Sequence, residues 1–204
     1  HDIDEIWDYK VVGIWQEEDR EEAAKYGQQP GDVHLLDKDM NYKYDNTDKE
    51  FQGTNMPRLR WSMRNDFTLF KNLNISFNMY SYIGHKQSLG RFTNDNALLN
   101  VTNQIKRDYW TPENRNNEYP RLANKKPAGV AYSIYKNASF LRFDNISIGY
   151  TFPKKLIEPL RIQNLNVNAT MKNAGYISGW PGYDPENSDK NTPRVIYFGI
   201  NLTL

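Results

Sequence analysis

The chain ends with RVIYFGINLTL, residues 194–204, in which apolar and polar residues alternate. Successive side chains of a β-strand point to opposite faces, so this stretch predicts a strand with one apolar face and one small, polar face. Alternation alone does not say whether the apolar face meets a protein core or lipid. The apolar positions are Ile196, Phe198, Ile200, Leu202 and Leu204, and the positions between them are Tyr197, Gly199, Asn201 and Thr203.

The same alternation recurs upstream, for example in LNISFNMYSYI (73–83) and NLNVNATMK (164–172). Helical periodicity is confined to REEAAKYG (20–27), which is long enough for two turns. The sequence therefore predicts an all-β chain. We expect six antiparallel strands, at about residues 6–16, 57–69, 72–85, 138–152, 162–173 and 194–204.

The connections between these strands alternate in length. Short ones follow Phe70 and Phe152, whereas long polar stretches occupy about residues 17–56, 86–137 and 174–193. Short turns on one side and long loops on the other, with strands of about ten residues, are typical of bacterial outer-membrane β-barrels. We therefore expect the three long stretches to be extracellular loops.

A soluble β-sandwich, such as a secreted carbohydrate-binding module, also alternates and is the alternative fold. Two features favour lipid on the apolar face. The opposite face carries Asn, Ser, Thr, Gly and Tyr instead of the Lys and Glu of a water-facing sheet, and Trp61, Tyr150 and Phe152 lie at strand ends, as in interfacial girdles. In a barrel the polar face lines the lumen, and the lumen-facing residues that we predict are Tyr80, Asn166, Asn168, Tyr197 and Asn201.

Composition narrows the function. The chain has 26 Lys and Arg against 25 Asp and Glu, a net charge of +1, so no nucleic-acid partner is expected. There are no cysteines, no run of about 18 apolar residues that would form a transmembrane helix, and no nucleophile or nucleotide motif, so we expect no enzymatic activity. The start, HDIDEIWDYK, is too charged for a signal peptide, and an exported protein would carry this chain as its later part.

The stretch DKDMNYKYDNTD (37–48) has the spacing of an EF-hand-like loop, which offers hard oxygen ligands to Ca²⁺. Tyr42 stands at the sixth position, where such loops use glycine for a sharp turn, so the loop must tolerate strain there or open. The alternative is an acidic loop that binds nothing. The predicted calcium ligands are Asp37, Asp39, Asn41, Lys43 (through its carbonyl), Asp45 and Asp48.

Aromatic residues in the long loops are candidates for contact with a substrate or partner, because rings stack on sugar faces and also pack loop cores. The carboxylates of Asp184 and Glu186 have a spacing that also suits a glycosidase, but the sequence D-P-E is better explained by a capped turn that proline stiffens. The candidate loop residues are Tyr109, Trp110, Tyr119, Trp180 and Tyr183.

Several stretches, in this order, resemble the C-terminal part of SusC-like TonB-dependent outer-membrane transporters of Bacteroidota. Single motifs are weak, whereas their order along the whole chain is specific. The stretches are YKVVGIWQ (9–16), AAKYGQQPGDV (23–33), DKDMNYKYDNTDKEFQG (37–53), YWTPENRNNEYPR (109–121), ASFLRFDNISIGYTFP (138–153), GWPGYDPEN (179–187) and the terminal strand.

The resemblance implies a barrel of about 22 strands, of which this chain supplies the C-terminal six or so, with a plug domain that this chain lacks. It implies active import of large nutrients, either glycan oligomers or peptides, driven by TonB through the plug, under a SusD-like surface lipoprotein lid in the outer membrane. The partners of the chain would be the rest of the barrel, the plug, the lid and membrane lipid. Related transporters often show D-x-N-x-D-G-x-I at the acidic loop, and Tyr42 departs from that glycine.

Overall fold

The computed structural model describes residues 3–89, 108–122, 124–187 and 190–204. Parts of the predicted loops 86–137 and 174–193 therefore lie outside the described residues. The chain divides into two compact units, which are described separately. Unit 1 comprises the described residues of His1–Met56 and Lys86–Lys136, and unit 2 comprises those of Pro57–His85 and Asn137–Leu204.

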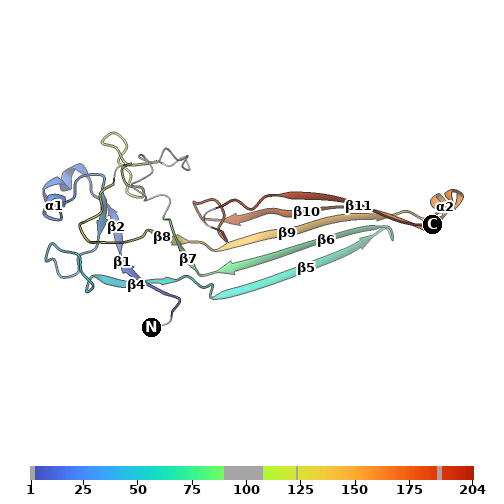
Figure 1. Ribbon diagram of the computed structural model, residues 1–204, viewed down its shortest axis with the longest axis horizontal. Coiled ribbons are helices and arrows are strands. Elements are labelled where there is room, and N and C mark those ends of the chain that lie inside the picture. The colour runs from blue at the N-terminus through green and yellow to red at the C-terminus, as the bar shows by residue number, and fades with distance from the viewer. Residues whose placement is uncertain (1–2, 90–107, 123, 188–189) are drawn as a thin grey trace. The chain divides into compact units, whose positions relative to one another are not determined.

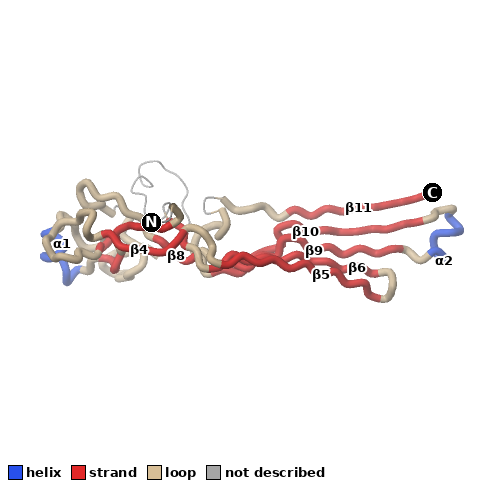
Figure 2. The backbone as a smooth tube through the Cα atoms, turned by 90° about the horizontal axis from the view of Figure 1, so that it is seen from below, coloured by secondary structure: helices blue, strands red, loops and turns tan. Residues whose placement is uncertain are grey.

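Unit 2 is one antiparallel sheet of five strands, in the order β11-β10-β9-β6-β5. Figures 1 and 2 show the five strands side by side. The prediction of an all-β, antiparallel chain is confirmed by this sheet. The strands are β5 (Leu59–Leu69), β6 (Leu73–Ile83), β9 (Phe140–Thr151), β10 (Asn164–Ser178) and β11 (Val195–Thr203).

The register keeps the apolar face and the polar face continuous across all five strands. Ile148 of β9 pairs with Ile75 of β6 and with Ala169 of β10, whereas its neighbour Ser147 pairs with Ser76 and Thr170. Paired residues of neighbouring strands share a face, so the alternation within single strands adds up to two faces of opposite character.

A bulge in β9 changes the face of the residues that precede it. Asn145 pairs with Asn78 of β6, but Phe143 pairs with the next residue, Met79, so Asp144 is an extra residue on β9. A bulge of this kind lets two residues oppose one and bends the strand. Counted back from Ile146, alternation alone would put Arg142 on the apolar face. The bulge brings it to the polar face instead, where it pairs with Tyr80.

The apolar face of the sheet is exposed. On its surface Phe198 is 82%, Ile200 72% and Ile177 66% exposed. In a β-sandwich these side chains would be covered by a second sheet. The sandwich interpretation is therefore wrong for the described part of this sheet.

The two ends of the sheet carry different connections. At one end, Phe70 and Lys71 form a tight turn between β5 and β6 with φ of 50° and 66°, and the amide of Asn72 donates to the carbonyl of Leu69 over 3.2 Å. The β9–β10 connection at this end contains α2 (Lys154–Ile157) and a 3₁₀ turn, η4 (Glu158–Leu160). The chain leaves β6 and β10 at the other end and returns after long segments, as predicted.

Strand β10 runs to Ser178, five residues beyond the predicted end at 173, so the predicted loop 174–193 begins inside a strand. Asn173 has a positive φ of 50°, and the register with β9 shifts between Lys172 and Gly175. The Asn-Ala-Gly sequence at 173–175 is typical of a loop. The pairing with β9 nevertheless resumes at Gly175, after the register shift, and extends the strand.

Unit 1 contains the stretch that we expected to be the first barrel strand, residues 6–16. This stretch forms two short strands, β1 (Glu5–Tyr9) and β2 (Val11–Ile14), and neither belongs to the five-stranded sheet. They pair with β4 (Lys49–Thr54) and β3 (Val33–Leu35), so the predicted loop 17–56 supplies strand partners that the pattern of residues 6–16 does not identify. A third pair joins β7 (Lys86–Ser88) to β8 (Tyr135–Asn137).

The predicted helical stretch forms η1 (Glu17–Asp19) and α1 (Arg20–Lys25), which confirms the helical turns. None of the helices in the described residues is both long and apolar enough to cross a membrane.

A buried ion pair joins two distant stretches of unit 1. The Asp32 carboxylate is fully buried and accepts from Nε of Arg121 over 2.8 Å and from the amide of Lys125 over 2.9 Å. Next to it the amide of Arg121 donates to the carbonyl of Gly31, and the ring of buried Trp110 lies against Gly31. Residues 23–33 and 109–121 therefore form one core.

Gly31 should be intolerant of alanine. Its φ is +89°, and an added Cβ would lie 2.5 Å from the Trp110 ring. We expect Gly31→Ala to lower the stability of unit 1 by about 2–4 kcal/mol, from left-handed strain plus a clash with a rigid ring. Gly129 is the matched control, because its φ is +75° and nothing lies within 4 Å of its Cβ position. Hydrogen exchange of unit 1 amides in the purified protein measures both, and equal losses would contradict this account.

Candidate functional site

The polar face of the five-stranded sheet collects the residues that we predicted to line a lumen. Asn166 pairs with Asn201, and Tyr197 pairs with Thr170. Asn168 lies two residues before Thr170 on β10, so its side chain shares their face. Tyr80 joins the same face through its pairing with Arg142. The structure therefore brings all five predicted side chains to one face.

A shallow hollow of about 360 Å³ lies on this face across four strands. The hydroxyl of Thr68 in this lining donates to Asn74 over 3.0 Å, and the amide of Asn166 donates to the hydroxyl of nearby Thr151 over 3.0 Å. These hydroxyl and amide groups offer donors and acceptors to a polar solute. The polar residues of the lining are Asp66, Thr68, Asn74, Ser76, Ser147, Asn166 and Asn168.

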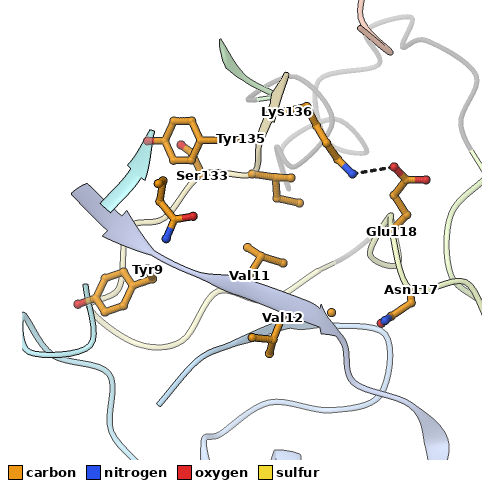
Figure 3. Close-up of a pocket in the computed structure, with 11 residues that line it drawn as sticks. Tyr9, Val11, Val12, Asn117, Glu118, Ser133, Tyr135 and Lys136 are labelled. Carbon is orange, nitrogen blue, oxygen red and sulfur yellow. Dashed lines mark hydrogen bonds and ion pairs between the residues drawn. The ribbon is translucent and has the colours of Figure 1, made fainter. Parts of the chain in front are cut away.

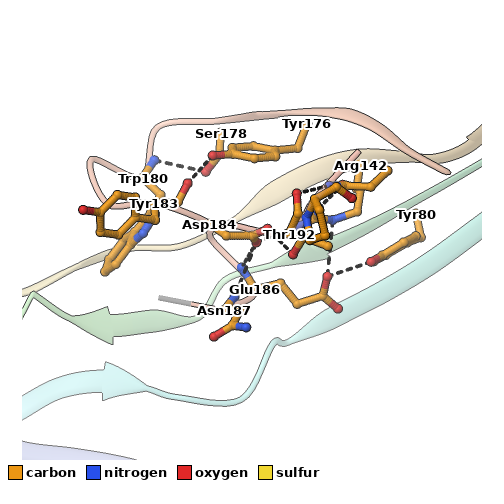
Figure 4. Close-up of polar contacts among 12 residues, drawn as sticks. Tyr80, Arg142, Tyr176, Ser178, Trp180, Tyr183, Asp184, Glu186, Asn187 and Thr192 are labelled. Carbon is orange, nitrogen blue, oxygen red and sulfur yellow. Dashed lines mark hydrogen bonds and ion pairs between the residues drawn. The ribbon is translucent and has the colours of Figure 1, made fainter. Parts of the chain in front are cut away.

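At the end of this face, the segment after β10 folds back onto the strands (Figure 4). Asp184 and Arg142, 1% and 2% exposed, form an ion pair there. The amide of Glu186 donates to Oδ1 of Asp184 over 2.9 Å, so Asp184 and Glu186 form the capped turn that the sequence suggested. Burial raises the pKa of the Asp184 carboxyl, but hydrogen bonds from Glu186, Thr192 and Arg142 outweigh it, and the pKa lies below its usual value.

The acidic loop 37–48 in unit 1 brings three of its predicted ligands together. Carboxylate oxygens of Asp37, Asp39 and Asp48 lie within 4.8 Å of one another, and Asp48 is fully buried. The other predicted ligands make contacts within the loop. The Asp45 carboxylate accepts from the amide and hydroxyl of Thr47, each over 2.7 Å, and Oδ1 of Asn41 accepts from the amide of Lys43 over 2.8 Å.

Tyr42 takes the backbone conformation that the glycine of such loops provides. Its φ is +63°, and Met40 also has a positive φ of 58°. The amides of both residues donate to the Asp37 carboxylate over 2.9 Å. The loop therefore stays closed despite the strain of a non-glycine residue.

Burial raises the pKa of the Asp37 carboxyl, but hydrogen bonds from the amide of Tyr42 and the hydroxyl of Tyr26 lower it more, so the pKa lies below its usual value. Hydrogen bonds from Thr47 likewise lower the pKa of Asp45. Both carboxylates are therefore ionised at neutral pH. Ionised carboxylates in this spacing fit a hard cation such as Ca²⁺.

An aromatic cluster, which the sequence did not reveal, supports the acidic loop. The Tyr26 hydroxyl donates to Oδ2 of Asp37 over 3.0 Å, and its ring stacks on Tyr44 with centroids 5.0 Å apart. Trp15 lies next to Tyr26 and stacks on His34 with centroids 3.5 Å apart. The abundance of tyrosine gave only a general sign of such a cluster, because its members are spread over residues 15–44 with no local spacing in common.

The predicted loop aromatics divide into buried and exposed rings. Trp110 is 5% exposed and donates from Nε1 to Gln16 over 3.0 Å, and Trp180 is 7% exposed with its ring against Gly182. These two rings pack within the protein. Tyr109 is exposed, whereas Tyr119 and Tyr183 are half-buried. The structure does not bring the five side chains into one site.

Unit 1 also holds a small crevice of about 190 Å³, which sequence reasoning missed (Figure 3). Val11 and Val12 of β2 form one wall, and an ion pair of Glu118 with Lys136, 2.7 Å long, lies at another. Its lining residues are far apart in the sequence, so no local pattern could mark them.

Comparison with known proteins identifies solved structures with a similar fold. No protein-family model and no curated protein matches the chain. A solved structure of the RagAB peptide importer in the "open-open" state matches 98% of the chain at 18% identity, with a TM-score of 0.66. The chain shares its fold with part of this importer. A structure of the RagAB peptide transporter matches 97% of the chain at 17% identity (TM-score 0.62), and the "closed-closed" importer matches 97% at 18% identity (TM-score 0.64).

The chain spans 22% of the length of each of these solved chains. Identities this low show a shared fold and nothing finer.

Proposed function

We propose that this chain forms part of the wall of an outer-membrane β-barrel that imports peptides. The observation that carries the proposal is the sheet of unit 2, whose exposed face is apolar and whose opposite face is polar in register over five strands. In water such an exposed apolar surface is unfavourable, whereas hydrocarbon accommodates it. The polar face then borders a water-filled interior, as in outer-membrane barrels.

The free edges of the sheet support a larger barrel. Strands β5 and β11 are the outer strands, and in the described residues each pairs on one side only. Unpaired backbone groups in hydrocarbon cost several kcal/mol each, so a membrane-embedded sheet must close. We infer that the remaining strands of the barrel and its plug are the first partners of this chain.

The solved neighbours are described as peptide importers or transporters, which favours peptides over glycan oligomers as the substrate class. The resemblance to SusC-like transporters adds TonB, acting through a plug, as the source of energy and a SusD-like surface lipoprotein as the lid. The residues of this chain would provide wall, lumen lining and outer loops. No covalent chemistry is required of them.

Uptake measurements test the substrate class. Cells with the intact transporter should accumulate labelled oligopeptides, and cells without it should not. Dissipating the proton-motive force should abolish the difference, because TonB depends on it. Labelled oligosaccharides serve as the comparison, and transporter-dependent uptake of these alone would refute peptide import.

Two neighbouring residues of β11 test the orientation of the sheet. Phe198 lies on the apolar face and Tyr197 on the polar face, and both are exposed, at 82% and 49%. Phe198→Arg should cost about 2–4 kcal/mol, because it puts a charge in the lipid, whereas Tyr197→Arg points into water and should be nearly neutral. The folded fraction in outer membranes, read from heat-modifiable mobility, reports both. Equal tolerance of the two changes would place the apolar face in water.

We also propose that the acidic loop of unit 1 binds Ca²⁺ through Asp37, Asp39 and Asp48. Its charge, its closed backbone and the ionised carboxylates support this proposal. The role would be structural, since bound calcium would hold together carboxylates that otherwise repel one another.

Chelation tests the calcium proposal. Calcium at about 100 times its Kd should stabilise the intact protein by about 2.7 kcal/mol, and EDTA should remove this gain. Asp48→Asn should abolish the response, because the buried carboxylate loses its charge. Glu118→Gln, an exposed carboxylate outside the loop, is the control. A melting midpoint that calcium and EDTA leave unchanged would contradict the proposal.

A further inference from the structure

The turn 182–187 sits on the polar face at an arginine that is almost fully buried. The Arg142 side chain is 3% exposed, and its guanidinium lies 5.4 Å from the Phe140 ring and 5.2 Å from the Tyr176 ring. Nη1 donates to Oδ1 of Asn173 over 2.5 Å. The guanidinium is therefore fixed in position, and its remaining donors face the turn.

The two carboxylates that meet Arg142 differ in how firmly they are held. Asp184 is 1% exposed and accepts from Nη2 of Arg142, from the Thr192 hydroxyl over 2.7 Å, and from the amides of Glu186 and Asn187. Four donors and complete burial make Asp184 a permanent partner of the arginine.

Glu186 is held much less firmly. Its side chain is 37% exposed, and its Oε2 accepts from the Tyr80 hydroxyl over 2.7 Å. The same oxygen lies 3.3 Å from Nε of Arg142, which is an ion-pair distance, but buried Nε has no hydrogen-bond partner. A buried charged donor without an acceptor is costly, so this edge of the guanidinium favours a better-placed carboxylate.

We propose that Nε of Arg142 and the Tyr80 hydroxyl form a binding site for a carboxylate of the transported peptide, which the chain's own Glu186 occupies in this structure. The inference deepens the proposed function and rests on it. A carboxylate is the group that a planar guanidinium edge and a phenol recognise together. Exchange of Glu186 for a ligand carboxylate leaves the charge at Arg142 unchanged, and the side chain of Glu186 is already 37% exposed to water before its release.

The location suits a substrate contact. Tyr80 and Arg142 project from neighbouring strands of the polar face, the face that the proposed barrel turns to its lumen. Asp184 keeps the turn attached when Glu186 leaves, so ligand binding requires the movement of one side chain and not the unfolding of the turn. Glu186 is thus an internal competitor that weakens the site for carboxylates.

Removing the competitor tests the proposal in the intact transporter. The probes are two hexapeptide libraries without Asp or Glu, one with free C-terminal carboxylates and one with C-terminal amides. Glu186→Gln should bind the free-acid library about tenfold more tightly than the natural protein does, a gain of about 1.4 kcal/mol, and bind the amide library unchanged. Tyr80→Phe should weaken binding of the free-acid library only. Glu118→Gln, at an exposed carboxylate paired with Lys136, is the matched control and should change neither.

Equal shifts for both libraries, or none, would overturn the carboxylate site while leaving peptide import intact. Retention of neither library by the natural protein would instead count against peptide import. In that case, the side-chain carboxylate resonance of Glu186, followed by NMR in sodium acetate, tests the site independently of any peptide. Acetate should shift this resonance relative to sodium chloride of equal ionic strength, because it displaces the Glu186 carboxylate from Arg142 and Tyr80, and identical resonances would refute the site. Glu186→Gln keeps the oxygen that accepts from Tyr80, and its melting midpoint verifies folding.

Discussion

Register between neighbouring strands is the constraint on which unit 2 depends. Backbone pairing places Ser147 between Ser76 and Thr170, and it places Ile148 between Ile75 and Ala169. Polar residues therefore pair with polar residues, and apolar residues pair with apolar residues. A slip of one residue would move every side chain of a strand to the wrong face. The alternation along the strands and the pairing between strands therefore stabilise one another, and the sheet acquires one apolar face and one polar face.

Much of this sheet could be predicted from the sequence, because alternation is a local property. The faces of the terminal strand and of residues 164–172 followed directly from the order of their side chains. The exposure of Phe198 and Ile200 then showed that no second sheet of the described residues covers the apolar face, which alternation cannot do. The acidic loop was also recognisable, since ligand spacing is local, and Tyr42 proved able to take the glycine conformation.

Features that depend on distant contacts could not be predicted. Residues 6–16 alternate weakly, and their partners in β3 and β4 are specified by the core of unit 1, not by their own pattern. Trp110 was predicted to be a contact residue of a loop but is buried against Gly31. The carboxylate of Asp32 pairs with Arg121, which lies 89 residues away in the sequence. The burial of a side chain in a loop depends on contacts with segments that are distant in the sequence. The local sequence pattern gives little information about such contacts.

Arg142 owes its side of the sheet to the bulge at Asp144, the extra residue of β9. Side chains change sides at every step along a regular strand, so pairing Asp144 as an ordinary residue would carry the guanidinium to the apolar face and bring Leu141 the opposite way. Deletion of Asp144 would instead leave both side chains on their present faces, because Asn145 would then follow Phe143 directly and the strand would alternate without a bulge. The loss of one residue at this point of the chain is therefore compatible with two separate faces, whereas the loss of two residues would turn the rest of the strand over, a rule of parity that acts on backbone count and is indifferent to residue type.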